Sequence, residues 1–265
     1  MNSMYQKFFV LIFISVNLLA QEKFDKFSVD ETFGNTIGTI VILTCNSEEQ
    51  FVNNTNLAES TFTPCSTFKI WNSLIALENN LIKSPEEDFY KWDGKEREIK
   101  LWNRDMTLKE AFNVSCVPAF QDLARKIGNE KMKQWIDSIK YGDRDISSGI
   151  DDFWLTRKDK KSIKISSIEQ AQMIKNLLIG KLPFSTSSIS VLKELMFARK
   201  LKTGNLYGKT GSGDIYNNEK YKNIGWYVGF VETKSDTYAF ACLVLGENVM
   251  GNDAKEIVIK IFQGN

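Results

Sequence analysis

The order of strand-like and helix-like stretches is the strongest constraint on the fold of this chain. The run 37–43 is dense in β-branched residues, which is typical of a buried strand. Two further strand-like runs, 225–231 and 238–245, are joined by a short polar link suited to a hairpin and precede a helical pattern over 253–262. This order predicts an α/β fold, an antiparallel sheet flanked by helices and built from both chain ends, with an all-helical lobe inserted between them.

The middle of the chain carries the helical periodicity that this fold requires. An apolar stripe with helical spacing is formed by Ile70, Leu74, Leu77 and Leu81. The stretches 108–127 and 167–179 are also helix-like. We therefore expect residues 21–62 and 195–265 to form an α/β lobe of one domain, and residues 63–194 to form its mainly helical lobe.

The first twenty residues differ in kind from the rest. Lys7 precedes an apolar run over 8–20, after which the sequence becomes charged at Glu22 and Lys23. The run is too short to span a bilayer comfortably and is typical of a signal peptide, with an uncleaved anchor as the alternative. We expect residues 1–20 to be removed and the domain over 21–265 to be exported, periplasmic where a periplasm exists, without membrane contact after cleavage.

The chain contains no histidine. This excludes Ser-His-Asp and Cys-His catalytic arrangements and every histidine-ligated zinc site. Four widely spaced cysteines without a C-x-x-C pair make a metal site improbable, and both disulfides and buried thiols are compatible with their spacing: Cys45, Cys65, Cys116 and Cys242. The net charge of +1, with both signs interspersed, gives no indication of a nucleic-acid partner.

The segment T-P-C-S-T-F-K over 63–69 predicts the start of a helix, with Thr63 as N-cap and Pro64 as the first helical residue. Ser66 then falls in the first turn, and Lys69 lies three residues later on the same face. A lysine base beside a serine nucleophile is a known alternative to histidine. Taken alone, the tetrapeptide favours an ordinary first-turn serine, and a second S-x-x-K over 190–193 lacks the preceding Thr-Pro.

A K-T-G triplet far downstream favours the interpretation of Ser66 as a nucleophile over that of an ordinary first-turn serine. Lys209, Thr210 and Gly211 stand in a strand-like context and are followed by Ser212. S-x-x-K followed by K-T-G is the signature of penicillin-recognising serine enzymes. A second triplet over 202–204 lacks the aromatic flanks and is expected to be a turn.

The chain resembles the class D (oxacillinase-type) serine β-lactamases over essentially the whole mature sequence. Five segments in the right order carry the resemblance: P-C-S-T-F-K over 64–69, S-C-V over 115–117, Y-G-D over 141–143, D-F-W-L over 152–155 and G-W-Y-V-G-F over 225–230. The resemblance implies the penicillin-recognising serine enzyme fold. It also implies hydrolysis of the lactam amide bond of penicillin-type antibiotics, which confers antibiotic resistance.

The resemblance implies catalytic roles for four residues. Ser66 would attack the lactam carbonyl and become acylated, and Ser115 with the help of Lys209 would pass a proton to the lactam nitrogen. Lys69 would be the general base, N-carboxylated by carbon dioxide or bicarbonate, with no other cofactor and no metal. Burial favours the neutral amine that reacts with carbon dioxide, and the apolar surroundings are expected from Phe68, Val117, Phe120 and Leu155.

The remaining roles concern binding of a small-molecule β-lactam. The indole N–H of Trp154 would donate to the carbamate, and Val117 would line the site. Thr210 and Lys209 would hold the substrate carboxylate beside Gly211, while the backbone N–H groups of Ser66 and Ser212 would form the oxyanion hole. Trp154 and Val117 also fit plain core positions. Both a monomer and a homodimer are compatible with the resemblance.

The sequence departs from the family pattern at two places. Asp143 stands where the family usually has asparagine, and the last helix lacks the usual arginine that grips the substrate carboxylate. Lys255 is a candidate substitute that offers a point charge in place of a fork. A β-lactam sensor domain that is acylated at Ser66 without release is the main alternative function, and a penicillin-inhibited cell-wall peptidase is a third.

Overall fold

The centre of the fold is an antiparallel sheet with the strand order β2-β1-β10-β9-β8-β7. It is seen in a computed structural model that describes residues 24–216 and 220–263. The strands, in sheet order, are β2 Gln50–Val52, β1 Ile37–Thr44, β10 Thr237–Gly246, β9 Asn223–Thr233, β8 Gly204–Asp214 and β7 Phe197–Lys200. The N-terminal strand β1 pairs with β10 along its whole length, so both chain ends build the sheet, as predicted.

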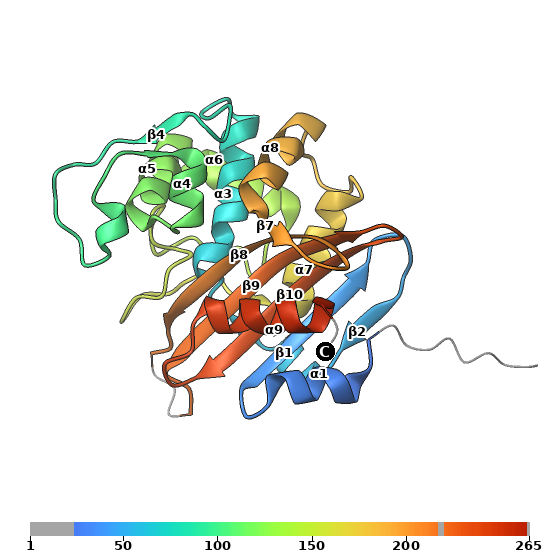
Figure 1. The fold of residues 1–265 in the computed structure, drawn as a ribbon. Coiled ribbons are helices and arrows are strands. Elements are labelled where there is room, and N and C mark those ends of the chain that lie inside the picture. Colours follow the sequence, from blue (N-terminus) through green and yellow to red (C-terminus); the bar gives the residue numbers. More distant parts are fainter. Residues whose placement is uncertain (1–23, 217–219, 264–265) are drawn as a thin grey trace, which may run out of the picture.

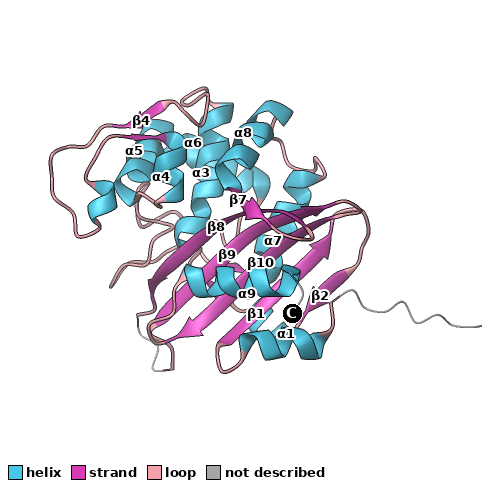
Figure 2. Cartoon of the chain, in the orientation of Figure 1, coloured by secondary structure: helices cyan, strands magenta, loops and turns pink. Residues whose placement is uncertain are grey.

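Both faces of the central strands are buried, which explains their nearly continuous apolar sequences. Successive side chains of β1 alternate between two cores: Val41 and Leu43 face the core of the helical lobe, whereas Ile40 and Ile42 face a second core. The second core includes side chains from α1 Lys26–Phe33 and α9 Gly251–Gln263, which cover the near face of the sheet in Figures 1 and 2.

The other face of the sheet carries the helical lobe, which lies above the sheet in Figure 1. Its helices are α3 Lys69–Glu78, α4 Leu108–Asn113, α5 Val117–Ile127, α6 Asn129–Ile139, α7 Ser167–Leu178 and α8 Thr186–Met196. α7 packs directly against β1 and β10. Short elements complete the chain: α2 Thr55–Glu59, the 3₁₀ turns η1 Cys65–Phe68 and η2 Lys100–Trp102, and two small ladders, β3 Thr61–Phe62 with β6 Ile165–Ser166 and β4 Asp88–Tyr90 with β5 Met106–Thr107.

Two details of the predicted helices are wrong. Helix α3 ends at Glu78, so Leu81 lies beyond it and is exposed, while Ile70, Leu74 and Leu77 are buried as the stripe predicted. The stretch 108–127 is two helices, because the backbone at Ser115 adopts a left-handed φ of 54° that no α-helix accommodates. The apolar periodicity is nearly the same on both sides of this break, so it did not reveal it.

Residues 1–20, the predicted signal peptide, lie outside the described residues. Across 24–216 and 220–263, no helix is both long and apolar enough to cross a bilayer.

Candidate active site

The predicted nucleophile and base are in direct contact. Ser66 lies in the 3₁₀ turn η1, and the amine nitrogen of Lys69, the first residue of α3, is 2.8 Å from the Ser66 hydroxyl oxygen. The serine retains 8% exposure whereas Lys69 has none. The Lys69 amine is therefore shielded from solvent, whereas part of Ser66 remains at the surface.

The prediction that Thr63 caps this helix is wrong. No side-chain hydrogen bond caps η1, and the Thr63 hydroxyl contacts the Ser162 hydroxyl at 2.6 Å and accepts from the Lys164 amine at 2.8 Å. The Thr63 carbonyl accepts from the indole N–H of Trp226 at 2.9 Å. Thr63 therefore ties the nucleophile turn to the sheet and to the residues around Lys164.

Strand β8 brings the K-T-G triplet against the nucleophile turn. A Cβ built on Gly211 would lie 2.9 Å from the Pro64 carbonyl oxygen and 3.1 Å from the backbone nitrogen of Thr67, so only glycine permits this approach. The Lys209 amine donates to the Ser115 hydroxyl and, at 3.0 Å, to the Thr210 carbonyl. The structure thus brings together the predicted residues of three distant segments.

The earlier K-T-G triplet forms the turn between β7 and β8, as predicted. The second S-x-x-K lies on α8, where Ser190 is exposed and the Lys193 amine pairs with Glu232. Neither copy contributes to the site.

Ser115 contacts Lys209 from the break between α4 and α5. The left-handed φ of Ser115 ends the helical backbone between α4 and α5. The Trp102 indole N–H holds the residue before it by donating to the Val114 carbonyl at 2.9 Å. Sequence reasoning missed Trp102. Its indole N–H within a polar loop was the available signal, since such a group needs a partner when it is covered.

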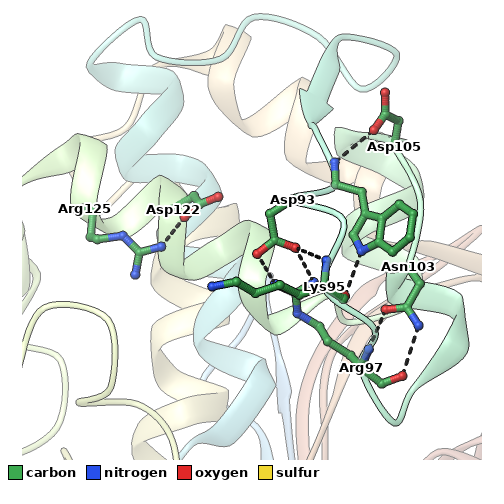
Figure 3. Close-up of polar contacts among 8 residues, drawn as sticks. Asp93, Lys95, Arg97, Asn103, Asp105, Asp122 and Arg125 are labelled. Carbon is green, nitrogen blue, oxygen red and sulfur yellow. Dashed lines mark hydrogen bonds and ion pairs between the residues drawn. The ribbon is translucent and has the colours of Figure 1, made fainter.

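The loop before Trp102 is held by its own polar contacts (Figure 3). The guanidinium of Arg97 binds both carboxylate oxygens of Asp93, at 2.8 and 2.9 Å, and the Asn103 amide bridges the backbone of Arg97. The Asp105 carboxylate accepts from the backbone N–H of Trp92 at 2.9 Å. These contacts connect separate parts of the long loop that leads to Trp102.

Burial governs the electrostatics of Lys69. Loss of hydration lowers the pKa of its amine to about 7, and the nearby thiols of Cys116 and Cys65 oppose this shift weakly. The amine lies 5.3 Å from the ring centroid of Phe120, and Phe68 and Leu155 are also buried in the surrounding core. Of the four predicted apolar neighbours, Phe120 is the one seen close to the amine, and Val117 is half-buried against the same core.

Lys209 is likewise buried, and its pKa lies well below the ordinary value. Desolvation is the main cause, followed by repulsion from Lys69 and then from Lys255. The half-buried Lys255, on α9, is therefore close enough to act on the same site. Lys255 therefore adds positive charge close to Lys209, which favours binding of an anion there.

The indole of Trp154 stacks on Phe68 with ring centroids 5.7 Å apart. It is completely buried, and its Nε1 has no hydrogen-bond partner among the described residues. An indole N–H orphaned in a core costs free energy unless it serves a bound group.

The exposed edge of β8 presents the remaining predicted binding residues. Thr210 is half-buried and Ser212 is exposed, and the Ser212 hydroxyl accepts from the backbone N–H of Gly251 at 2.9 Å. This bond joins the start of α9 to the strand and fixes the helix that carries Lys255.

Asp143 has a structural use. One of its carboxylate oxygens accepts from the backbone N–H groups of Asp145 and Lys164, each at 3.1 Å. The preceding Gly142 has a φ of 52°, and a Cβ there would lie 2.1 Å from the Lys164 carbonyl oxygen. Asparagine offers the same acceptor oxygen, so the change from asparagine to aspartate conserves this arrangement.

A buried relay behind the nucleophile turn was not predicted. The Gln170 amide on α7 donates to the Thr67 hydroxyl at 3.2 Å, and that hydroxyl donates to the Pro64 carbonyl at 2.7 Å. The Tyr141 hydroxyl donates to Oε1, the side-chain amide oxygen of Gln170, at 3.4 Å. These bonds connect the nucleophile turn to α7 and to Tyr141.

The four cysteines, all among the described residues, are free thiols. Cys65 and Cys116 lie beside Ser66 and Ser115 in sequence and both act on Lys69, but no bond joins them.

Comparison with known proteins agrees with this geometry. Residues 28–263 match the family of penicillin-binding protein transpeptidase domains. The chain is 37% identical over 240 residues to the probable β-lactamase YbxI of Bacillus subtilis, covering 90% of this chain and 84% of that protein. The solved structure of FUS-1 (OXA-85), a class D β-lactamase from Fusobacterium nucleatum subsp. polymorphum, superposes with a TM-score of 0.81 at 34% identity, covering 90% and 97% of the two chains.

The chain also resembles a regulatory protein. It is 33% identical over 239 residues to BlaR1 of Bacillus licheniformis, covering 90% of this chain but 37% of that protein. Since the family match and the identities extend over most of the chain, it belongs to the penicillin-binding protein transpeptidase family and, within it, to the class D serine β-lactamases.

Proposed function

We propose that this protein hydrolyses the lactam amide bond of penicillin-type antibiotics through an acyl-enzyme on Ser66. The observation that carries the proposal is the fully buried Lys69 amine, 2.8 Å from the hydroxyl of Ser66, a residue that keeps 8% of its surface exposed. A buried lysine with a pKa near 7 is neutral in a large fraction of molecules at neutral pH. Only the neutral form can accept the serine proton.

The proposed acylation uses the contacts described above. Lys69 takes the Ser66 proton as the serine oxygen bonds to the lactam carbonyl carbon, and the N–H groups of Ser66 and Ser212 stabilise the oxyanion. The carbon–nitrogen bond then breaks, and the lactam nitrogen takes the Ser115 proton, which Lys209 replaces. Thr210, Lys209 and Lys255 hold the substrate carboxylate.

Deacylation requires Lys69 to act a second time, so the proton that it took from Ser66 first passes to solvent, and Lys209 regains a proton from solvent. Water gives a proton to the Lys69 side chain as its oxygen bonds to the acyl carbon, and the ester bond to Ser66 breaks. The serine oxygen recovers the proton, and the ring-opened acid leaves.

Carboxylation of Lys69 forms part of this proposal. The residues present fit a carbamate: a neutral, desolvated amine for carbon dioxide to add to, and the orphaned Trp154 N–H to donate to the new oxygens. When bound, the group supplies a carboxylate-like general base. No further cofactor is proposed, and the acylation and hydrolysis would confer resistance on a cell that exports the enzyme.

The decisive experiment follows penicillin hydrolysis by the purified protein with and without bicarbonate, beside Ser66→Ala. We expect many turnovers, faster with bicarbonate, and none in the variant. Turnover that survives in Ser66→Ala would overturn the nucleophile assignment.

The similarity to BlaR1 supports a second candidate function, a β-lactam sensor acylated at Ser66 without release. The same experiment separates the two: a single stoichiometric acylation, with the acyl group persisting for hours on the intact protein, would favour the sensor.

A further inference from the structure

A cavity of about 320 Å³ lies between the loop after Trp154 and the end of β8. Its walls continue the three segments of the proposed active site. Thr63 precedes the nucleophile turn, Thr156 follows the Trp154 segment, and Asp214 ends the strand that carries Lys209. The backbone N–H of Asp214 donates to the Thr156 hydroxyl at 3.2 Å, which joins two of these walls. The lining residues include none of the predicted catalytic residues.

The charged residues of the cavity are predominantly cationic. Four cations and two carboxylates line it: Arg157, Lys160, Lys161, Lys164, Asp159 and Asp214. Arg157 and Lys160 share a single carboxylate, Asp152, at 3.2 and 2.7 Å, which lies outside the lining. The Asp214 carboxylate accepts from two neutral donors, the hydroxyl of Tyr216 at 3.1 Å and the amide of Asn223 at 2.9 Å.

Lys164 is the most buried of the cations that line the cavity. It is half-buried, and burial lowers the pKa of its amine although the Asp143 carboxylate opposes the shift. The amine donates to the Thr63 hydroxyl at 2.8 Å and forms no ion pair within 4 Å among the described residues. An ammonium has three donors, so further hydrogen bonds remain available. The hydroxyls of Thr63 and Ser162 are buried beside it.

A partly desolvated ammonium beside two hydroxyls, with further cations around the same cavity, is the donor set that binds a tetrahedral oxyanion. We propose that this cavity is a second binding site, for a small oxyanion of the phosphate type, held by Lys164 and the hydroxyls of Thr63 and Ser162. Lys161 and Arg157 supply the surrounding positive field. The bound anion joins the loop over 156–164 to the residue that leads into the nucleophile turn.

The test measures the melting temperature against inorganic phosphate at constant ionic strength, maintained with sodium chloride. A ligand that binds only the folded state raises the melting temperature in a saturable manner. We expect a saturable rise for the unaltered protein and at least a tenfold weaker apparent affinity in Lys164→Gln. Lys131→Gln, a change of an exposed lysine on α6, serves as the matched control and should stay within twofold.

Two further measurements keep the proposal falsifiable. If Lys164→Gln does not fold, Lys161→Gln and Ser162→Ala should each weaken phosphate binding several-fold. Crystals soaked in selenate should show an anomalous peak within hydrogen-bond distance of the Lys164 amine. An equal rise in melting temperature when sodium chloride replaces phosphate at the same ionic strength would contradict a specific phosphate site. If Lys209→Met loses phosphate binding while Lys164→Gln binds phosphate normally, the anion binds in the substrate site, and the proposal is contradicted.

Phosphate from free solution and phosphate carried on an organic monoester share this chemistry. Glycerol 3-phosphate in the same titration distinguishes them: tighter binding than inorganic phosphate assigns the site to a monoester, and weaker binding assigns it to the free ion. Binding of neither compound would contradict the proposal. None of these readouts depends on β-lactam hydrolysis. Failure of the phosphate site would therefore leave the proposed function untouched, and failure of the proposed function would leave the phosphate site untouched.

Discussion

The Lys69 amine reaches the Ser66 hydroxyl from inside the protein, across 2.8 Å, with no water-accessible surface of its own. Serine and base therefore experience different environments although they are three residues apart. The hydroxyl faces the substrate side, whereas the protonation state of the amine is set by the core around it.

Acylation should therefore depend on pH through Lys69. Its pKa is lowered to about 7, so the amine is protonated below this value and cannot accept the serine proton. In bicarbonate-free buffer, we expect the acylation rate to fall about tenfold for each pH unit below 7. Stopped-flow acylation between pH 5.5 and 9 measures this dependence. A flat profile would show that another group is the base.

Stability should depend on pH through the same group, because the folded state, like acylation, favours the neutral Lys69 amine. Unfolded Lys69 has its ordinary pKa of 10.5, so between about 7 and 10.5 the unfolded chain binds more protons than the folded one. The free energy of unfolding therefore rises with pH across this window, and the cost of the buried ammonium is complete below it. Lys209 contributes with the same sign.

Urea unfolding of the bicarbonate-free protein at several pH values measures this slope. Lys69→Met should reduce the slope without abolishing it, because Lys209 remains. An unchanged slope in Lys69→Met would contradict the depressed pKa.

Trp154→Phe should separate the indole N–H from the packing of the ring. Phenylalanine retains much of the apolar contact with Phe68 but offers nothing to a carbamate. We expect turnover to fall roughly 10- to 100-fold, the range seen when a supporting hydrogen bond to a reactive group is lost, and to recover partly with added bicarbonate. Trp135→Phe, at a ring stacked on Phe184 away from the site, is the matched control and should change little.

Lys255 should contribute to substrate affinity. Its charge acts on Lys209, and removing it in Lys255→Ala should raise KM roughly tenfold with a smaller change in kcat, because a charged hydrogen bond to the carboxylate is lost. Lys255→Arg should lower KM, since a guanidinium binds a carboxylate with two parallel bonds. Lys260→Ala, an exposed lysine on the same helix, controls for general charge effects. Equal KM values in all three variants would exclude the role.

Asp143→Asn should be nearly neutral, because the same oxygen position accepts the N–H groups of Asp145 and Lys164. Asp143→Ala removes both bonds and should cost about 1–2 kcal/mol of unfolding free energy. Thermal melts of the two variants test the comparison. A large loss of activity in Asp143→Asn at unchanged stability would instead show that its charge matters for the reaction.

The sequence predicted the parts of the site that depend on local patterns. Ser66 and Lys69 meet because three-residue spacing on a helical turn places them on one face, and the glycine of the K-T-G triplet indicated a close approach. The sheet followed from β-branched runs at both chain ends. These signals are local, so no knowledge of distant partners was needed.

The features that were missed depend on contacts between distant residues. Thr63 looked like a helix cap, but its hydroxyl is used by Ser162 and Lys164, about a hundred residues away. The left-handed turn at Ser115 places its hydroxyl in contact with Lys209. Pro118, in the first turn of α5, was a local signal for a new helix that the prediction did not use. The partners of Thr63 and Ser115 are set by tertiary structure, and a single sequence carries little trace of them.

The pairing of β1 with β10 has a consequence for how the activity is gained during synthesis. Ile40 lies opposite Cys242, so the first strand of the sheet has no partner on that edge until nearly the entire chain has been made. Lys209 likewise needs β9, which follows it, to be fixed in place. A nascent chain arrested before β10 should therefore contain Ser66 and Lys69 yet react with no antibiotic, and folding should be slow because its decisive contacts are long-range.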